Sequence, residues 1–298
     1  MIENKTITSK IRVALIYTIV VLLAIISLVP LWNTVCISFS ESSAISANKV
    51  GIWPVDFTTV AYKKIIEDIQ FWRTFLNSVV RVIGVLVISL PITLMAAYVL
   101  SRDKKVFRGR EFCMKLLQIS MLFSGGMIPT FIAYRNLGLL NTRWVLILPG
   151  VVGSFNIIMI MNFFRSLPTS LEEAAILDGA NPLQILTRVF VPCAKPSIAT
   201  IALFIIVGNW NEFMSGMIYI MQKEKYPLMT YINSLQVDIS ELAEAGNIDQ
   251  IKGIVSSGLS SKNLNASKIV VAVIPLLLIY PLLQKYLITG IVMGSVKE

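Results

Sequence analysis

Long apolar runs constrain the fold of this chain more than any other feature of its sequence. A helix needs about 20 predominantly apolar residues to cross the ~30 Å hydrocarbon core of a bilayer. The runs that meet this requirement are 13–33, 75–100, 113–134, 144–164, 197–221 and 268–290. Backbone polar groups inside a bilayer must be satisfied within the spanning element, so runs of this length predict helices. We therefore expect an all-α membrane protein with six transmembrane helices.

The composition agrees with a membrane protein and excludes most enzyme chemistry. Mean hydropathy is +0.74 and only 14% of residues are charged, whereas charged residues make up about 25% of a soluble domain. The chain has no histidine, and Cys36, Cys113 and Cys193 show no paired spacing. The usual zinc sites and the Ser-His-Asp and Cys-His catalytic arrangements are therefore not expected. We expect a transport protein with neither catalytic residues nor a metal site.

The basic residues predict the orientation of the chain. The net charge of +9 comes from lysines and arginines that flank apolar runs, which is typical of membrane orientation and does not favour a nucleic-acid partner. Positive residues crowd 5–12 and 102–115, so both segments are expected in the cytoplasm. Both termini and 165–196 are then cytoplasmic. The loops 34–74, 135–143 and 222–267 are external, and we expect 222–267 to be exposed.

The cytoplasmic segment 165–196 reads as two short helices joined by a glycine turn. Thr169 and Ser170 are alternative N-caps for a first helix, followed by the acids Glu172 and Glu173, which suit a helix N-terminus. Asp178-Gly179 supplies a stop, because glycine accepts the left-handed conformation that ends helices.

A second helix is expected to begin at Asn181-Pro182, with asparagine as the cap and proline in the first helical position. Leu183, Leu186 and Phe190 then form an apolar stripe at i, i+3 and i+7. Pro192 and Pro196 close the unit. From these residues alone, a surface hairpin that merely links two spans is an equal alternative.

The stretch "EEAAILDGANPLQILTRVFVPCAKP" (172–196) resembles the EAA motif of ABC-importer permeases. Glu173-Ala174-Ala175, Gly179 and Pro192 stand at the motif's spacings, while Val189 and Val191 replace its Ile and Leu. The resemblance implies a type I importer-like fold, with a cytoplasmic coupling helix-turn-helix between helices 4 and 5 that docks into a separate ATPase. The coupling residues it implies are Glu172, Glu173, Ala174, Ala175, Asp178, Gly179, Ala180 and Pro192.

Three further stretches, 123–150, 209–213 and 279–298, resemble carbohydrate-uptake permeases, chiefly those for oligosaccharides or polysaccharide fragments. The chain has no GxxxxGK[ST] loop, so it is not expected to bind ATP or another cofactor itself. The resemblance implies a single permease domain over 1–298, in a bacterial cytoplasmic (inner) membrane, that works by alternating access. It also implies a second permease, two ATPase subunits that bind ATP and Mg²⁺, and an extracellular solute-binding protein that delivers carbohydrate.

Polar residues within the apolar runs mark a candidate substrate path, because such residues normally face protein or a watery cavity. These residues are Asn77, Arg81, Asn209, Trp210, Asn211 and Glu212. Asn209 and Glu212 are expected on one helix face, with Trp210 as a surface for sugar stacking. The alternatives are hydrogen bonds between helices and, for Arg81, a side chain that snorkels to the interface. Gly125-Gly126 and Pro129 are expected to permit either bending or close packing of span three.

Two other functions remain open at this point. One is a secondary transporter, in which no ATPase takes part and 165–196 is only a loop. The other is an ABC permease for a solute that is not a sugar. The spacing of the EAA motif favours the ABC importer for carbohydrate over both.

Overall fold

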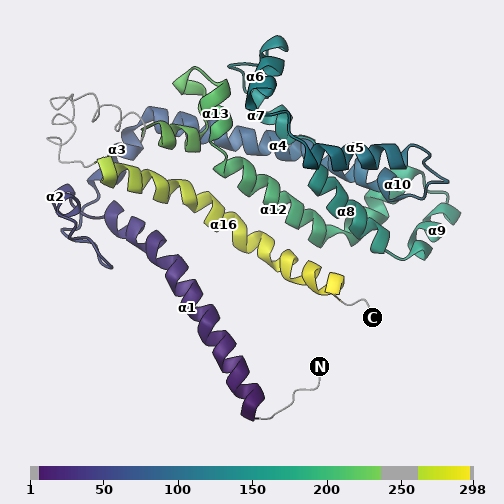
Figure 1. Cartoon of the computed structure of the whole chain (residues 1–298), viewed down its shortest axis with the longest axis horizontal. Coiled ribbons are helices and arrows are strands. Elements are labelled where there is room, and N and C mark those ends of the chain that lie inside the picture. The colour runs from purple at the N-terminus through teal and green to yellow at the C-terminus, as the bar shows by residue number, and fades with distance from the viewer. Residues whose placement is uncertain (1–6, 236–260, 296–298) are drawn as a thin grey trace. The chain divides into compact units, whose positions relative to one another are not determined.

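The computed structural model describes residues 7–235 and 261–295 (Figure 1). Within these ranges the ordered elements are helices, and no strand is present. The longer helices are α1 (Ile7–Ser38), α4 (Ile69–Ser101), α5 (Arg110–Leu122), α6 (Met127–Asn136), α8 (Ser154–Ser166), α9 (Thr169–Leu177), α12 (Lys195–Asn211) and α16 (Ser261–Ser295). The shorter elements are α2 (Ser42–Ser46), α3 (Val60–Glu67), α7 (Trp144–Ile147), η1 (Leu148–Gly150), α10 (Pro182–Ile185), η2 (Leu186–Phe190), α11 (Val191–Cys193), α13 (Met214–Tyr219) and η3 (Lys223–Lys225).

The expected spans are present, although two of them are bent. Four helical segments of the described chain are long and apolar enough to cross a membrane, namely 10–38, 69–101, 144–166 and 262–281. Two further pairs qualify when each pair is taken as one broken span: α5 with α6, bent by 118°, and 182–193 with α12, bent by 85°. The described chain thus has up to six spans.

Span three is broken at the glycines expected to permit either bending or close packing. Helix α5 ends at Leu122 and α6 begins at Met127. Gly126 precedes α6 with φ +81° and ψ 169°, a backbone region open essentially to glycine alone. Span three is therefore two helices, and the bend follows from the residue type at this position.

Span five is shorter than the expected continuous helix over 197–221. Helix α12 ends at Asn211, and the next residue, Glu212, has extended geometry with ψ 119°. A separate helix, α13, follows. The apolar composition continues across this break, so hydropathy alone did not reveal it. Asn209 and Glu212 consequently do not share a helix face, contrary to the sequence-based expectation.

The chain divides into two compact units, one of residues 1–69 and 236–273 and one of residues 70–235 and 274–298. In the first unit, the start of α16 is bound to the end of α1 and to the loop after α3. Asn263 and Ser267 donate side-chain hydrogen bonds to the carbonyls of Ile37 and Ser38, at 3.3 and 3.2 Å. The Nζ atom of Lys268 lies 2.9 Å from the Asp68 carboxylate. The single domain expected over 1–298 stays a prediction.

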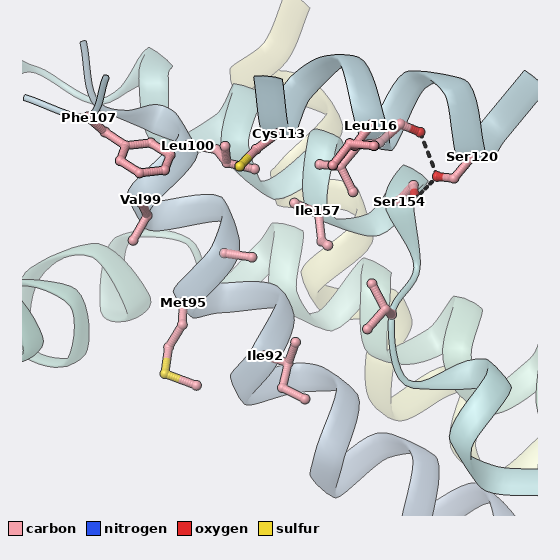
Figure 2. Close-up of a pocket in the computed structure, with 13 residues that line it drawn as sticks. Ile92, Met95, Val99, Leu100, Phe107, Cys113, Leu116, Ser120, Ser154 and Ile157 are labelled. Carbon is pink, nitrogen blue, oxygen red and sulfur yellow. Dashed lines mark hydrogen bonds between the residues drawn. The ribbon is translucent and has the colours of Figure 1, made fainter. Parts of the chain in front are cut away.

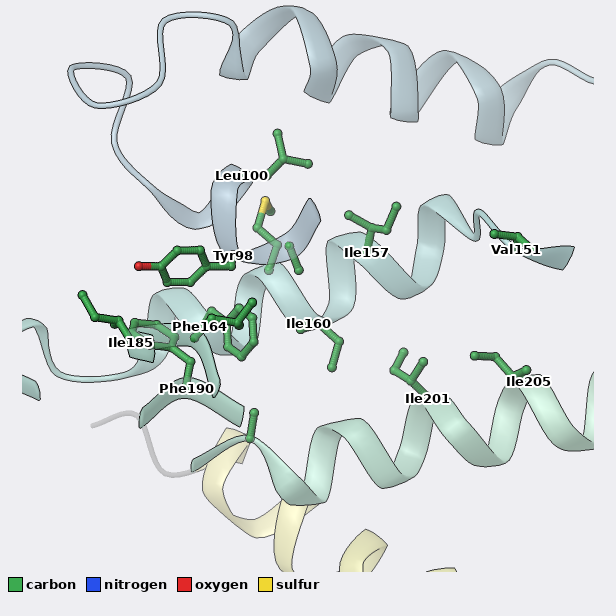
Figure 3. Close-up of a cluster of buried hydrophobic side chains, with 14 of the residues drawn as sticks. Tyr98, Leu100, Val151, Ile157, Ile160, Phe164, Ile185, Phe190, Ile201 and Ile205 are labelled. Carbon is green, nitrogen blue, oxygen red and sulfur yellow. The ribbon is translucent and has the colours of Figure 1, made fainter. Parts of the chain in front are cut away.

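The core of the second unit joins three spans to the segment 182–194. Buried side chains of α4, α8 and α12 form one cluster that includes Tyr98, Ile160 and Ile201 (Figure 3). Phe190 belongs to the same cluster, with its ring centroid 5.2 Å from that of Phe164 and 5.3 Å from that of Tyr98. The segment expected in the cytoplasm is thus packed into the core that holds the spans together.

The expected external loop 222–267 is only partly described, since 236–260 lie outside the described residues. The expectation that it is exposed is wrong for 227–234. Leu228 and Thr230 are fully buried. The Leu228 amide donates to Ser78 Oγ at 2.8 Å, and Thr230 Oγ1 donates to the Phe213 carbonyl at 2.8 Å. These bonds fold the segment back against α4 and the start of α13.

Candidate functional site

We define the coupling segment as residues 169–194. Its first helix, α9, begins at Thr169. The residue in the N-cap position is Pro168, with φ −59° and ψ 133°, and no side chain caps the helix there. The expectation that Thr169 or Ser170 caps the helix is therefore wrong. Both residues already have helical geometry, because the extended proline sets the first turn and its carbonyl accepts from the Leu171 amide at 3.3 Å.

The end of this helix agrees with the sequence. Gly179 has φ +75°. Its amide donates to the Ile176 carbonyl and the Ala180 amide donates to the Ala175 carbonyl, both at 3.0 Å. This pair of bonds is the Schellman motif, which satisfies the carbonyls left free at a helix end. The predicted stop at Asp178-Gly179 is confirmed.

The start of the second helix is confirmed as well. The Asn181 side chain accepts from the Gln184 amide at 2.9 Å, and the Gln184 side chain accepts from the Asn181 amide at 2.9 Å. This reciprocal capping box fixes the entry of α10, whose first residue is Pro182. Two well-formed ends therefore meet in a turn of three residues, 179–181, and hold the two helices at a defined angle.

The predicted apolar stripe is only partly correct. Leu186 and Phe190 are buried, but Leu183 is 62% exposed and Ile185 is buried in its place. Residues 186–190 form a π-helix, which changes the angle between successive side chains. The regular period that places Leu183 on the face of Leu186 and Phe190 therefore does not hold here.

An ion pair ties the coupling segment to the end of α4. Arg102 Nη1 donates to Glu172 Oε2 of α9, and both side chains are largely buried. The Arg102 guanidinium also lies 4.5 Å from the Tyr98 ring centroid and 4.8 Å from that of Phe190, within cation–π range. Span two thus holds both halves of the segment, α9 through Glu172 and the second helix through Phe190.

Sequence reasoning missed this role of Arg102, which it used only as a sign of orientation. The signal was present in the spacing of Tyr98 and Arg102, one helical turn apart at the end of a span. The sequence alone did not show which acidic residue pairs with Arg102. Glu172 follows 70 residues later and reaches Arg102 only through the tertiary fold.

The face of the coupling segment that points away from Arg102 and the core is exposed, and we call it the open face. Leu177 is 88% exposed and Ile176 is 56% exposed. Glu173, Ala174, Asp178 and Gly179 are also exposed, while Ala175 and Ala180 pack against the core cluster. Pro192 is also exposed, as the second residue of the short helix α11. The segment therefore presents apolar and acidic side chains outward from a firmly held base.

A second group of polar residues surrounds the break after α12. Arg81 is only 5% exposed, and its guanidinium donates to Glu212 Oε2 at 2.6 Å and to the Glu212 carbonyl at 3.1 Å. Glu212 Oε1 accepts from the Ser215 amide at 2.7 Å, at the start of α13. Arg81 does not snorkel; it is buried and paired, and it joins α4 to the broken span.

The remaining candidates of the substrate path are mostly engaged in packing. Asn77 donates to the carbonyls of Glu224 and Tyr226, at 2.9 and 3.2 Å. Asn209 donates to the Ile205 carbonyl at 2.8 Å. Trp210 is 4% exposed and its ring packs edge-on against Phe75, so it presents no face for sugar stacking in this conformation. Asn211 is exposed. A role for any of them in a substrate path stays a prediction.

Apolar helices long enough to cross a membrane, two of them broken, indicate a membrane protein, and its helix pair over 169–194 leaves one face exposed. Residues 69–292 match the family described as "Binding-protein-dependent transport system inner membrane component". The chain belongs to this family. It is a multi-pass permease subunit of an ABC transporter and not an enzyme, since the ATPase of such a transporter lies in a partner. Family membership also excludes the alternative of a secondary transporter.

Two relatives and one solved structure show how far the similarity extends. The chain is 37% identical over 284 residues to the "Polygalacturonan/rhamnogalacturonan transport system permease protein YtcP" of Bacillus subtilis, covering 95% of this chain and 97% of that protein. It is 28% identical over 296 residues to the "Diacetylchitobiose uptake system permease protein NgcG" of Streptomyces coelicolor, covering 95% and 88%. A structure described as "a bacterial ABC transporter involved in the import of the acidic polysaccharide alginate" aligns with TM-score 0.82 and 33% identity, covering 94% and 98%.

Proposed function

We propose that this chain is a permease subunit for the import of oligosaccharides or polysaccharide fragments, coupled to a separate ATPase through residues 170–196. The similar proteins support the substrate class, since two are named as permeases for polygalacturonan and rhamnogalacturonan and for diacetylchitobiose, and the third is a transporter that imports alginate. The similarity to these proteins spans nearly the whole chain. A permease for a solute that is not a sugar is the remaining alternative.

The open face of the coupling segment is the observation that carries the coupling proposal. Ile176 and Leu177 expose large apolar side chains at the end of α9, and covering such surface is favourable by about 25 cal/mol per Å². The Schellman motif and the capping box make the segment stiff, and Arg102 and Phe190 attach it to the spans. A partner that moves this face would therefore move α4 and the core with it.

The proposal includes the partners that such a chain requires. Two cytoplasmic ATPase subunits bind ATP and Mg²⁺, a second permease completes the pathway, and an extracellular solute-binding protein delivers the sugar. Residues 10–32 of α1 are exposed along their whole length in this chain, as expected of a helix covered by lipid or by the second permease. The proposal also has both termini in the cytoplasm, with the spans in the cytoplasmic membrane of a bacterial cell.

Alternating access is proposed to use the breaks in spans three and five. A broken span supplies short helices that tilt without unfolding a long one. The Arg81–Glu212 pair lies at the second break, where it holds α4 against the start of α13. Asn77, Arg81, Asn209, Trp210, Asn211 and Glu212 remain candidates for residues that meet the sugar when this region rearranges.

The decisive experiment combines purification in mild detergent with uptake of a radiolabelled oligogalacturonide in intact cells. The wild-type chain is expected to retain an ATPase and a second permease. Leu177→Asp places a charge on the open face and is expected to lower both ATPase recovery and uptake at least tenfold. Ile52→Asp, at a side chain 72% exposed in the loop before α3, serves as the control.

Two results would count against the proposal. Recovery of the ATPase with Leu177→Asp at the wild-type level would remove the open face from coupling. Normal ATPase recovery in the wild type, without uptake of any oligosaccharide in a panel of acidic and neutral fragments, would favour a solute that is not a sugar.

A further inference from the structure

A large apolar groove lies within the second unit, on the side of α4 where α5 and α8 meet it. Its volume is about 790 Å³, within the range of ligand pockets. Residues Ile92 to Leu100 of α4 form one wall, and Cys113 to Ser120 of α5 form another (Figure 2). At 1.5 Å per helical residue, the α4 wall is about 12 Å long. The groove is therefore shorter than one leaflet of the bilayer, which is about 15 Å of hydrocarbon.

The lining of this groove fits an apolar occupant. Its side chains are almost all aliphatic or aromatic, and its hydroxyls, those of Ser120 and Ser154, are bonded to each other at 2.8 Å (Figure 2). A sugar needs unpaired polar groups to replace its hydration, and this slot does not offer them among its lining residues. A hydrocarbon chain needs none. The occupant is therefore apolar over the length of the groove.

One end of the groove is strongly basic. Phe107 and Leu100 line that end, next to the turn that connects α4 to α5. Arg110 Nε donates to the Leu100 carbonyl at 2.9 Å, so the Arg110 side chain lies directly at the mouth. Lys105 and Arg108 are exposed on the same turn, on either side of Phe107 in the sequence.

Within the turn between α4 and α5, the positive charge exceeds the negative charge. Arg102 is paired with Glu172, and Lys104 with Glu111. Within 101–115 this leaves Lys105, Arg108, Arg110 and Lys115 against one further acid, Asp103. An apolar slot that ends in excess cations is complementary to a molecule with a hydrocarbon tail and an anionic head.

We propose that this groove binds an anionic phospholipid, with one acyl chain between α4, α5 and α8 and the phosphate at Lys105, Arg108 and Arg110. A transmembrane helix of a second permease would also fill an apolar slot, but it would gain nothing from unneutralised cations at its end. The lipid satisfies both features at once. It would also contact α4 next to Arg102, which holds the coupling segment.

The test uses the full chain, with the subunits that co-purify with it, in phosphatidylcholine nanodiscs that contain a photoreactive lipid. Phosphatidylglycerol and phosphatidylcholine, each with a diazirine in the middle of one acyl chain, are compared after illumination by mass spectrometry of the adducts. Phosphatidylglycerol is expected to label the peptides over 92–100 and 113–120 about fivefold more than phosphatidylcholine.

Two variants, each with a control, test the contacts of the lipid headgroup and of the acyl chain separately. Lys105→Gln with Arg108→Gln is expected to lower phosphatidylglycerol labelling to the phosphatidylcholine level, whereas Lys63→Gln with Lys64→Gln, exposed on α3, leaves it unchanged. Ala96→Phe fills the slot from α4 and is expected to remove labelling by both lipids. Val87→Phe, on an exposed part of the same helix outside the lining, serves as its control.

Equal labelling by the two lipids, or labelling that Lys105→Gln with Arg108→Gln does not lower, would overturn the proposal. So would adducts that form on the isolated chain and disappear in the assembled transporter, since the groove would then be covered by another subunit.

Discussion

Gly179 tests the coupling segment at the scale of one residue. Its φ of +75° strains residues with a Cβ by about 1–2 kcal/mol, and β-branched residues more. A Cβ built at this position meets nothing within 4 Å, so any effect comes from the backbone and not from a clash. Gly179→Val is expected to lower ATPase recovery and sugar uptake at least tenfold, normalised to inserted protein.

Gly179→Asn is the matched control, because asparagine tolerates the left-handed region. It is expected to keep at least half of the wild-type uptake. If the valine variant docks and transports as well as the asparagine variant, the angle between α9 and α10 does not matter for coupling.

The Arg81–Glu212 pair gives a second prediction at this scale. Removing one partner of a buried pair leaves an uncompensated charge and costs about 3–5 kcal/mol, while removing both costs much less. Because the Glu212 side chain is 32% exposed, we expect the lower end of this range. Glu212→Gln should reduce the melting temperature of the purified chain clearly, and Arg81→Met combined with Glu212→Gln should restore most of the loss.

The melting temperature is followed by fluorescence-detected size exclusion after heating. Lys104→Gln breaks an exposed pair, Lys104–Glu111, and is expected to change stability by less than about 1 kcal/mol. A double variant less stable than Glu212→Gln alone would show that the pair is not the reason these residues are buried together.

At the scale of elements, the break in span three permits a comparison of two neighbouring glycines. Gly126 has positive φ, whereas Gly125 does not, and neither would place a Cβ in close contact. Gly126→Ala is expected to cost about 1–3 kcal/mol and to reduce uptake, because α6 cannot begin at its present angle. Gly125→Ala is expected to behave like wild type in the same uptake and melting experiments. Equal effects of the two variants would mean that the 118° bend does not depend on the backbone of Gly126.

The sequence predicted those parts of the elements that local chemistry determines. The apolar runs located the spans, Gly179 located the end of α9, and Asn181-Pro182 located the start of α10. The break after Asn211 was missed because hydropathy stays high across it, and the bonds that stabilise it come from Arg81, 131 positions earlier. The π-helix over 186–190 was missed because propensities carry no signal for it.

In the candidate site, too, local features were predicted and long-range contacts were not. The exposed EAA residues were recognised from their spacing, since spacing along one helix and turn is a local property. The contacts of Arg102 with Glu172 and Phe190 were not, because they join segments about 70 to 90 residues apart. Trp210 was proposed as a sugar-stacking surface from its residue type, and its burial against Phe75 depends on how α4 packs on α12.

At the scale of the whole molecule, the orientation in the membrane determines which of these features meet the ATPase and which meet the sugar. The concentration of lysine and arginine in 102–115 predicts that this turn is cytoplasmic. Arg102 binds Glu172 directly, so the turn and the coupling segment must lie on the same side. When α5 and α6 are taken as one broken span, the turn after α6 is expected on the opposite side.

This orientation is tested with single cysteines in a chain whose three native cysteines are replaced. Arg188→Cys reports the coupling segment and Leu137→Cys the turn after α6; both positions are exposed. An impermeant maleimide added to intact spheroplasts is expected to label Leu137→Cys at least tenfold faster than Arg188→Cys. Permeabilisation should make the two rates similar, which shows that access and not reactivity sets the difference. Faster labelling of Arg188→Cys in intact spheroplasts would place the coupling segment outside, where no ATP-hydrolysing partner could reach it.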